Sequence, residues 1–536
     1  MSPPPLRAEF DVVVIGAGHN GLICAAYLAR AGLRVCVLEK RLEAGGGLTT
    51  EEVTRPGYYH NLHSVFHDAV EIMPAMTDLE LAERHHVAYV RPPVQVGLAL
   101  SDDRALCVHD EVAASVASIA RISPDDARAY QAVHDRYREF VEAVVVPALY
   151  SSPPPPSHAS AALEGSPEGM EWLRLGRSSP ADVAAELFQS DPVRALALFQ
   201  LAIPRGVVSD YAGLGMLVPL VVTQVERSHL CVGGSHALAH GLWRALLRAG
   251  GVVRGMHEAL RIRVENGRAV GVDLRGGGTV HARAVVSAVG FRQTVLGLLG
   301  DAGLPEAVVR PARHFKLDEY SIFSVHLALE EPPRYRAARF APELDRALKV
   351  GVGLDGPADF TRLWTDIRAG RAPEPAMYCA APSLHDPTQA PPGRHTAFLW
   401  QPAPYRLGGD HARWDHERER YADRLLERWR AAAPNLGGGN IIARFIQTPL
   451  DIERKLSSMQ EGGAFLGRAS LDQLDCFRPA PAWSQARAPL PGLYLASGAA
   501  HPGGGILGAA GYIAAGAVAE TLSVPRWWLG EGAPAR

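Results

Sequence analysis

The sequence has few cysteines, no block of like charge and no long run of large apolar side chains. Its six cysteines are scattered through 536 residues without a CxxC pair, which argues against a disulfide scaffold and a thiolate metal site. Lys and Arg number 54 against 57 Asp and Glu, a net charge of −3, so we expect no nucleic-acid partner. The length favours two domains, and the cysteine usage favours a reduced, cytoplasmic protein.

Membrane-crossing segments are also missing from the sequence. The first ten residues, MSPPPLRAEF, have no apolar core of the kind that a signal peptide needs. The longest uncharged stretch, 503–519, is rich in Gly and Ala, and we expect a buried helix there with its preceding loop. The apolar stretch 214–222 is either core, which we favour, or a patch for peripheral contact with a membrane.

What the sequence does contain is a complete nucleotide-binding unit in residues 11–39. An apolar strand runs into Gly16-Ala17-Gly18-His19-Asn20-Gly21, and a helix from 22 to 30 leads to a second strand that ends on Glu39. The three glycines allow, in order, a tight turn, a close pyrophosphate and a close helix–strand contact. The phosphates face the positive end of the helix, and the Glu39 carboxylate can accept both ribose hydroxyls. The unit predicts a dinucleotide, either NAD or FAD.

A second GxGxxG pattern, 351–356, serves as a control for the first. It follows the charged stretch 344–346 rather than a recognisable strand, and Pro357 comes directly after it. We interpret it as a surface loop without a binding function.

Glycine-bearing strand–helix pieces occur at the start, the middle and the end of the chain, which indicates one domain built from discontinuous segments. Short strands at 260–264 and 269–274, separated by Asn266-Gly267, predict a hairpin attached to its sheet. The helix-rich stretch 76–224 and a mixed stretch with a strand at 320–329 would form a second domain. The expected division is 1–75, 225–300 and 456–525 for nucleotide binding, 76–224 and 301–455 for a substrate or cap domain, and 526–536 for a flexible tail.

The motifs together resemble the flavin-dependent phytoene desaturase superfamily. The resemblance rests on GAGHNGL at 16–22, the spacing from Glu39 to Gly45-Gly46, TPLDIE at 448–453, and the stretch from Gly492 to Ile506. It is strongest for the branch that includes a pyridine-nucleotide-disulfide-oxidoreductase-domain protein. It implies an α/β fold, with a Rossmann-type, glutathione-reductase-like FAD-binding domain and a mixed α+β substrate domain. It also implies FAD rather than NAD.

The residues support FAD independently, because a flavin needs a second backbone cradle and the glycine loop 498–508 supplies one before a helix. By resemblance, Gly45-Gly46 passes the pyrophosphate and ribityl chain, and the strand near Ala259 contacts the adenine. Related enzymes commonly have Arg where this chain has Gly47, and Arg41 is a possible substitute. The residues expected to bind FAD are Gly16, Gly18, His19, Asn20, Gly21, Glu39, Lys40, Gly45, Gly46, Gly47, Ala259, Ala288, Gly498, Gly504, Gly505, Ile506 and Gly508.

The resemblance implies a dehydrogenase or desaturase that moves a hydride from a small apolar, isoprenoid- or carotenoid-like substrate to flavin N5. An oxygen-using amine or tailoring oxidase and a non-catalytic flavoprotein remain as alternatives. The chain has no second dinucleotide unit, so oxygen, a quinone or a diffusing nicotinamide would reoxidise the flavin. The sequence leaves the oligomeric state open.

No catalytic pair is apparent in the sequence, and His63 and His501 are only weak candidates. His60, His63 and His67 are spaced as if on one helical face, but without an adjoining ligand cluster we expect a wet wall near the flavin rather than a metal site. Trp400 and Trp414 could line a substrate channel, although core positions are the more common use of such side chains.

Overall fold

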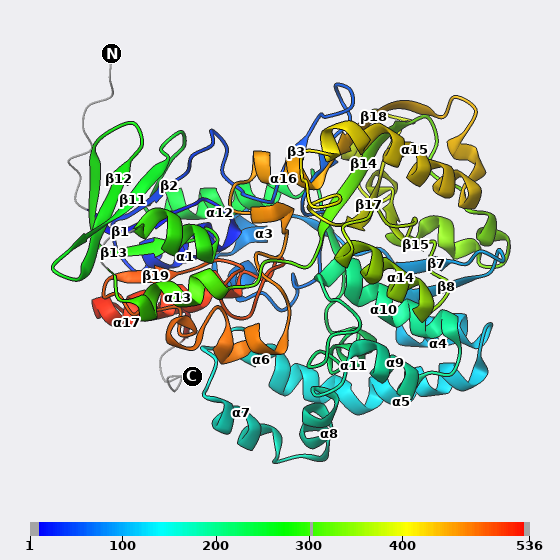
Figure 1. Ribbon diagram of the computed structural model, residues 1–536, viewed down its shortest axis with the longest axis horizontal. Coiled ribbons are helices and arrows are strands. Elements are labelled where there is room, and N and C mark those ends of the chain that lie inside the picture. The colour runs from blue at the N-terminus through cyan, green and yellow to red at the C-terminus, as the bar shows by residue number, and fades with distance from the viewer. Residues whose placement is uncertain (1–9, 301–303, 530–536) are drawn as a thin grey trace.

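The computed structural model describes residues 10–300 and 304–529, which form two lobes side by side (Figure 1). One lobe is built on a seven-stranded sheet with the order β10-β2-β1-β13-β12-β11, and β19 pairs with β13. Its parallel strands are β1 (Phe10–Ile15), β2 (Val35–Leu38), β10 (Val252–Arg254), β13 (Thr279–Ser287) and β19 (Leu493–Leu495). Strands from the start, the middle and the end of the chain therefore share one sheet.

The predicted hairpin is confirmed and extends this sheet. Strands β11 (Ala259–Glu265) and β12 (Arg268–Leu274) are antiparallel, and β12 pairs with β13. Asn266 and Gly267 both have positive φ angles, 49° and 71°, the conformation that a two-residue hairpin turn requires.

Three helices cover one face of the first sheet and share one apolar core with it (Figure 1). Helix α1 (His19–Arg30) lies between α12 (His236–Arg248) and α17 (Ala509–Leu522) and contacts both. Helix α17 is nearly all Ala and Gly, so α1 can approach it closely: a side chain on Gly511 would lie 2.2 Å from the carbonyl oxygen of Asn20. The expected buried helix in 503–519 is therefore confirmed.

The second lobe is built on a seven-stranded sheet with the order β18-β14-β17-β16-β15-β7-β8. All pairs are antiparallel except β15 with β7. The strand expected at 320–329 is present as β14, and both of its faces are buried. The bounds are β7 Val94–Ala99, β8 Ala105–His109, β14 Ser321–Leu329, β15 Lys349–Val352, β16 Met377–Ala380, β17 His395–Ala403 and β18 Ile441–Gln447.

Helices lie on both sides of the second sheet. Odd-numbered residues of β14, such as Phe323 and Val325, pack with α15 (Trp414–Ala432), and Trp414 is core there rather than channel lining. The other side, which we call the inner face, packs with α10 (Asp191–Arg205) and the helices around it. These helices are α4 (Val112–Ala120), α5 (Pro124–Phe140), α6 (Val146–Leu149), α7 (Pro156–Leu163), α8 (Pro167–Leu175), α9 (Pro180–Leu187), α11 (Leu217–Val222) and α14 (Pro357–Arg368).

Short elements join the lobes. Strands β3 (Thr50–Glu51) and β4 (His60–Asn61) pair, and β9 (His229–Cys231) lies between β5 (Phe66–His67) and β6 (Tyr89–Val90). The remaining helices are α2 (Pro74–Asp78), α3 (Leu81–His85), α13 (Glu306–His314) and α16 (Pro449–Lys455), and π-helical turns occupy 141–145 and 293–299.

Three details differ from the sequence-based expectations. The helix-rich stretch 76–224 also contains β6, β7 and β8. The pattern at 351–356 is not a surface loop at its start, since β15 is buried, and Asp191 lies beside Gly356 where a phosphate would have to bind. In the expected tail, the Trp527 ring stacks on Tyr27, and residues 530–536 lie outside the described part of the chain.

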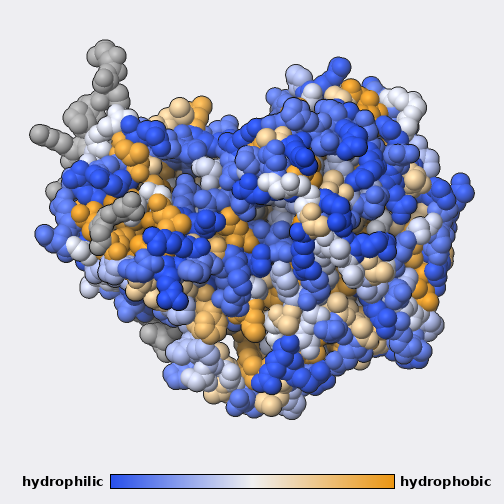
Figure 2. Space-filling model, in the orientation of Figure 1, coloured by the Kyte–Doolittle hydropathy of each residue, from blue (hydrophilic) through white to orange (hydrophobic). Residues whose placement is uncertain are grey.

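The stretch 214–222 is core, as favoured, because Leu214 and Val218–Val222 are buried. The outer surface is mostly hydrophilic, and its outline dips where the lobes meet (Figure 2). Within the described ranges, every helix is too short or too polar to cross a bilayer.

Candidate functional site

The Gly16–Gly21 turn has the geometry that the sequence predicts for a nucleotide cradle. Gly16 has a φ angle of +96°, and a side chain on Gly21 would lie 2.2 Å from the Gly16 carbonyl oxygen. Gly18 differs from both, because no described atom lies within 4 Å of the place where its Cβ would stand. The space over Gly18, at the N-terminus of α1, can therefore receive a pyrophosphate.

Glu39 stands at the end of β2, beside the turn. One oxygen of its carboxylate accepts a hydrogen bond from the backbone N–H of Ala17 at 2.9 Å, and the other accepts from Arg41 at 2.9 Å. Its backbone is tied to Arg254 and His257, which lie just before Ala259. Sequence analysis missed these two residues, because their position depends on β10 pairing with β2 more than two hundred residues away.

The strand-free segment 45–47 crosses directly over the turn. The Gly45 N–H donates to the Ala17 carbonyl at 2.8 Å, and Gly18 and Gly45 form an isolated bridge. Gly45 and Gly46 have φ angles of +134° and +60°, which glycine adopts without strain. A side chain on Gly46 would lie 3.1 Å from the Gly18 Cα, so glycine is needed here for close approach.

The loop 498–508 lies beside this cradle, as predicted from the sequence. The Asn20 side chain accepts a hydrogen bond from the Gly511 N–H at 3.1 Å, which fixes the start of α17 against the start of α1. Burial lowers the pKa of His19 to about 4, and a hydrogen bond to the Gly505 backbone opposes this shift. The two cradles are therefore held together by side chains from one turn, although they are almost five hundred residues apart.

The remaining predicted residues take more peripheral positions. Ala288 lies behind the turn and donates its N–H to Ile15 at 2.8 Å. The Lys40 ammonium donates to the Ser457 hydroxyl at 3.0 Å. Ala259 begins β11, and Gly47 lies beside His63 and Met459.

Arg478, which sequence analysis did not select as a site residue, supports the flavin loop from behind. Its guanidinium is buried and donates to the carbonyls of Gly498 at 2.7 Å and Gly467 at 3.2 Å, with longer bonds to three others. Burial lowers its pKa to about 10, and the nearby Asp318 carboxylate opposes this shift. Asp318 itself accepts the N–H groups of Phe465 and Gly467, so the pair orders the whole of 463–478.

The three spaced histidines do not lie on a helix, since β4 carries His60 and β5 carries His67. Burial lowers the pKa of each to about 3, so all three are neutral at physiological pH, and Lys455 and Arg41 add to the shift at His63. In the described ranges, no group of three potential ligands could hold a metal ion. The helical-face interpretation was wrong, because their spacing of three and four residues falls in short strands and a bend rather than in a helix.

His501, the other weak catalytic candidate, is buried between the lobes. Its Nε2 lies 3.2 Å from the carbonyl oxygen of Ala148, and the Tyr150 hydroxyl donates to the Leu507 carbonyl at 3.0 Å. These contacts fasten α6 to the loop 498–508. They favour a packing role for His501.

An aromatic surface on the second sheet faces the histidine segment. Phe398, Trp400 and Tyr378 lie side by side on the inner face, with ring centroids 5.3–5.9 Å apart. Phe66 packs on Phe398 and Tyr378, and His60 meets the His326 ring edge-on at 5.4 Å. The segment that carries the histidines therefore lies between the aromatic inner face and the glycine cradle.

A buried charge cluster lies at one edge of the inner face. Lys349 is 4% exposed, its ammonium is 3.3 Å from Asp68, and Arg205 lies 3.5 Å from the other oxygen of that carboxylate. Arg205 also binds Glu226 at 2.9 Å. Burial raises the pKa of Asp68, but Lys349 and Arg205 more than offset this and lower it. The cluster is balanced, with two cations and two carboxylates, around a cavity of about 40 Å³.

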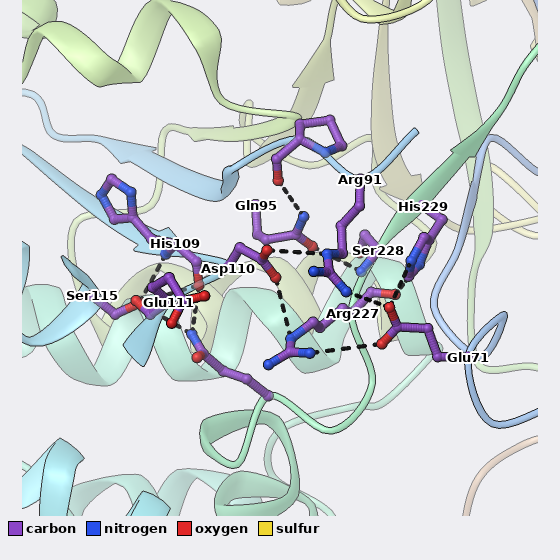
Figure 3. A network of polar contacts seen from close by, with 12 residues as sticks. Glu71, Arg91, Gln95, His109, Asp110, Glu111, Ser115, Arg227, Ser228 and His229 are labelled. Carbon is purple, nitrogen blue, oxygen red and sulfur yellow. Dashed lines mark hydrogen bonds and ion pairs between the residues drawn. The ribbon is translucent and has the colours of Figure 1, made fainter. Parts of the chain in front are cut away.

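A second charge network adjoins this cavity and fixes the strap that carries Asp68. Arg91 and Arg227 both bind the two carboxylates of Glu71 and Asp110, and His229 lies 3.4 Å from Glu71 (Figure 3). These residues come from β8, β9 and the segments around β5 and β6. The network joins the two lobes with charges that again cancel.

The cradle fits the FAD that the sequence predicts. The space over Gly18 is open, and two buried polar atoms beside the cradle, His19 Nε2 and Thr49 Oγ1, find no hydrogen-bond partner among the described residues. Such atoms are rare in proteins and mark positions where a bound group supplies the partner. The individual cofactor contacts stay predictions.

Comparisons with known proteins identify the same kind of molecule. The family model for flavin-containing amine oxidoreductases matches residues 21–519. One of the polypeptides of the limonene dehydrogenase of Castellaniella defragrans is 31% identical over 535 residues, which cover 97% of this chain and 96% of that protein. Pyridine nucleotide-disulfide oxidoreductase domain-containing protein 2 of Mus musculus is 31% identical over 559 residues, 96% of this chain and 94% of that protein.

More distant similarities agree with these. A lycopene-forming phytoene desaturase of Paracoccus sp. is 27% identical over 525 residues, 94% of this chain and 96% of that protein. Putrescine oxidase has the same fold, with a TM-score of 0.63, at 16% identity over 96% of this chain and 99% of that one. The resemblance inferred from the motifs and the α/β fold with its Rossmann-type domain are confirmed.

Proposed function

Because the chain belongs to the family of flavin-containing amine oxidoreductases and is an FAD-dependent oxidoreductase, we propose that it dehydrogenates an apolar, isoprenoid-like substrate. The relatives named above include a dehydrogenase and a desaturase, and their names specify limonene and phytoene, which are both hydrocarbons. The observation that carries the proposal is the aromatic inner face, which lies across the histidine segment from the glycine cradle. Such a face suits a hydrocarbon and offers it no charge.

The acidic side chains near this space argue against an amine substrate. An ammonium group would need a carboxylate to replace its hydration. Asp68 is already held by Lys349 and Arg205, and Glu51 by Lys455 and Arg41. Neither carboxylate is free to bind a substrate cation.

Bound FAD supplies the hydride acceptor in this chemistry. The contribution of the chain is to bind, orient and exclude water, for which the apolar surface of Phe66, Phe398 and Trp400 is suited. We assign His63 to the wall of the site rather than to proton storage, because burial, Lys455 and Arg41 lower its pKa to about 3. We propose that a diffusing acceptor, such as a quinone, oxygen or a nicotinamide, takes the electrons, since the sequence has one dinucleotide unit.

The test is anaerobic reduction of the purified holoenzyme, followed by loss of the oxidised-flavin absorbance at about 450 nm. Cyclic and acyclic terpenes and short polyenes form one arm of the panel, and primary amines with matching carbon skeletons form the other. We expect bleaching with members of the first arm only. Bleaching by amines, with hydrogen peroxide formed on admitting air, would instead establish an amine oxidase.

A further inference from the structure

The inner face contains a row of buried polar atoms that no part of the proposed hydrocarbon chemistry uses. In the sheet register, Ser324 of β14 stands directly opposite Trp400 of β17 on one side and Gln447 of β18 on the other. Directly opposed residues point to the same face of a sheet, and neighbouring strands are about 4.8 Å apart. The three side chains therefore form one continuous row, which we call the polar row.

All three members of the polar row have a buried polar atom that lacks a hydrogen-bond partner among the described residues. These atoms are the Ser324 hydroxyl oxygen, the Trp400 indole nitrogen and the Gln447 amide oxygen. Ser324 is 1% exposed and Gln447 is 2% exposed, so bulk solvent does not reach them. Buried polar atoms are nearly always paired, and three in one row on one face call for a common partner.

His326 lies next to the row, two residues along β14 from Ser324. It is fully buried, and neither ring nitrogen has a partner in the part of the chain that the structure describes. Burial, with His60, His63 and Lys455, lowers its pKa well below the usual value, so the ring is neutral. Through its contact with the His60 ring, it also places the polar row beside the histidine segment and the cradle.

The chemistry of these atoms selects one class of partner. The Trp400 N–H can only donate, the Gln447 oxygen can only accept, and the Ser324 hydroxyl does both. An ammonium would leave the indole N–H without an acceptor, and a carbonyl or carboxylate would leave the amide oxygen without a donor. A hydroxyl group both donates and accepts, and it brings no charge into a neutral site.

We propose that the polar row of Ser324, Trp400 and Gln447 binds a hydroxyl group of the substrate, which is then an isoprenoid-like alcohol rather than a plain hydrocarbon. This inference rests on the proposed function, because it specifies the substrate class of the same site. The aromatic rings of Phe398 and Tyr378, which adjoin the row, hold the hydrocarbon part of the molecule. The polar row fixes how that molecule lies along the inner face.

The test uses the FAD-loaded protein and three probes with one carbon skeleton: geraniol, the hydrocarbon that lacks its hydroxyl group, and geranylamine. Equilibrium dialysis measures binding to the oxidised enzyme, so the result does not depend on turnover. We expect geraniol to bind about 10- to 100-fold more tightly than the hydrocarbon, because two hydrogen bonds are made and buried groups are no longer unpaired. Equal affinities, or tightest binding of the amine, would overturn the proposal.

The variants Ser324→Ala, Gln447→Leu and Trp400→Phe should each reduce the preference for geraniol while leaving hydrocarbon binding unchanged. Each removes a polar group that has no partner within the protein, so folding should not suffer, and melting temperatures check this. Thr396→Val is the matched control, because Thr396 also has a buried unpaired hydroxyl on the same sheet but pairs with Ala328, outside the row. A preference that survives all three row variants, or that Thr396→Val also abolishes, would refute the role of the row.

Failure of this inference is distinguishable from failure of the proposed function. If geraniol binds selectively through the polar row but neither terpene bleaches the flavin, the proposed dehydrogenation is wrong and the hydroxyl site stands. If the hydrocarbon bleaches the flavin and binds as well as geraniol, the proposed function stands and the hydroxyl site is wrong.

Discussion

Replacing Gly18 with Ala should separate cofactor binding from folding. Gly18 has φ −69° and ψ 168°, angles that any L-residue adopts, and its missing Cβ would meet no described atom within 4 Å. The gain from a less flexible unfolded chain, about 0.4–1 kcal/mol, is opposed by the poorer capping ability of Ala at the start of α1. The flavin-free protein should therefore keep its stability within about 1 kcal/mol.

The cost should fall on the cofactor, because the new methyl group occupies the space over the turn. A pyrophosphate pushed away from the helix start loses about two charge-assisted hydrogen bonds, each about 1.5–3 kcal/mol. The total of roughly 3–6 kcal/mol corresponds to an FAD affinity that is weaker by about 10²- to 10⁴-fold.

The assay combines the flavin-to-protein absorbance ratio after gel filtration with the melting temperature of the flavin-free protein. Gly21→Ala is the control, because its methyl group would stand 2.2 Å from the Gly16 carbonyl oxygen and must disturb the fold itself. We expect Gly18→Ala to be colourless with an unchanged melting temperature, and Gly21→Ala to lose stability. A Gly18→Ala protein that stays fully yellow would refute the placement of the pyrophosphate.

Three further predictions concern the support of the site. Arg478→Met should lower the free energy of unfolding by about 3–5 kcal/mol, measured by urea denaturation, and Arg478→Lys should not rescue it, because one ammonium cannot serve five carbonyls. Glu39→Ala should weaken FAD retention, measured by dilution, yet leave turnover at saturating FAD unchanged; a loss of saturated turnover would contradict its place at the ribose. The pKa values of His60, His63 and His67, lowered from 6.5 to about 3, stabilise the fold above pH 6.5, and this stability is lost as the pH falls from 6.5 toward 3. Unfolding measured at pH 7 and pH 5 should differ by up to about 2 kcal/mol per histidine, and a pH-independent stability would show that these rings are not buried as neutral groups.

The nucleotide-binding unit could be predicted from the sequence because its parts are local. The turn at Gly16–Gly21, the following helix and Glu39 fall within thirty residues, and each glycine has its own steric reason. The hairpin at Asn266-Gly267 was predictable for the same reason, since two adjacent residues with positive φ determine it.

The substrate side could not be predicted, because its geometry comes from sheet register between distant segments. Ser324, Trp400 and Gln447 become neighbours only when three strands pair across more than a hundred residues. Strands β7 and β8 were missed because they are short and buried inside a helix-rich stretch. Arg478 carried no signal either, since an arginine in sequence suggests a solvent-exposed charge and not a buried donor to five carbonyls.

The pairing of the chain's beginning with its end sets an order of assembly during biosynthesis. Strand β19, the loop 498–508 and helix α17 are the last parts of the nucleotide lobe to leave the ribosome, yet α17 packs directly on α1 and its Gly511 binds Asn20. The first unit must therefore wait, with one side of α1 uncovered, while about 450 further residues are synthesised. The complete FAD site cannot exist on a nascent chain, so loading of the cofactor belongs to the finished polypeptide.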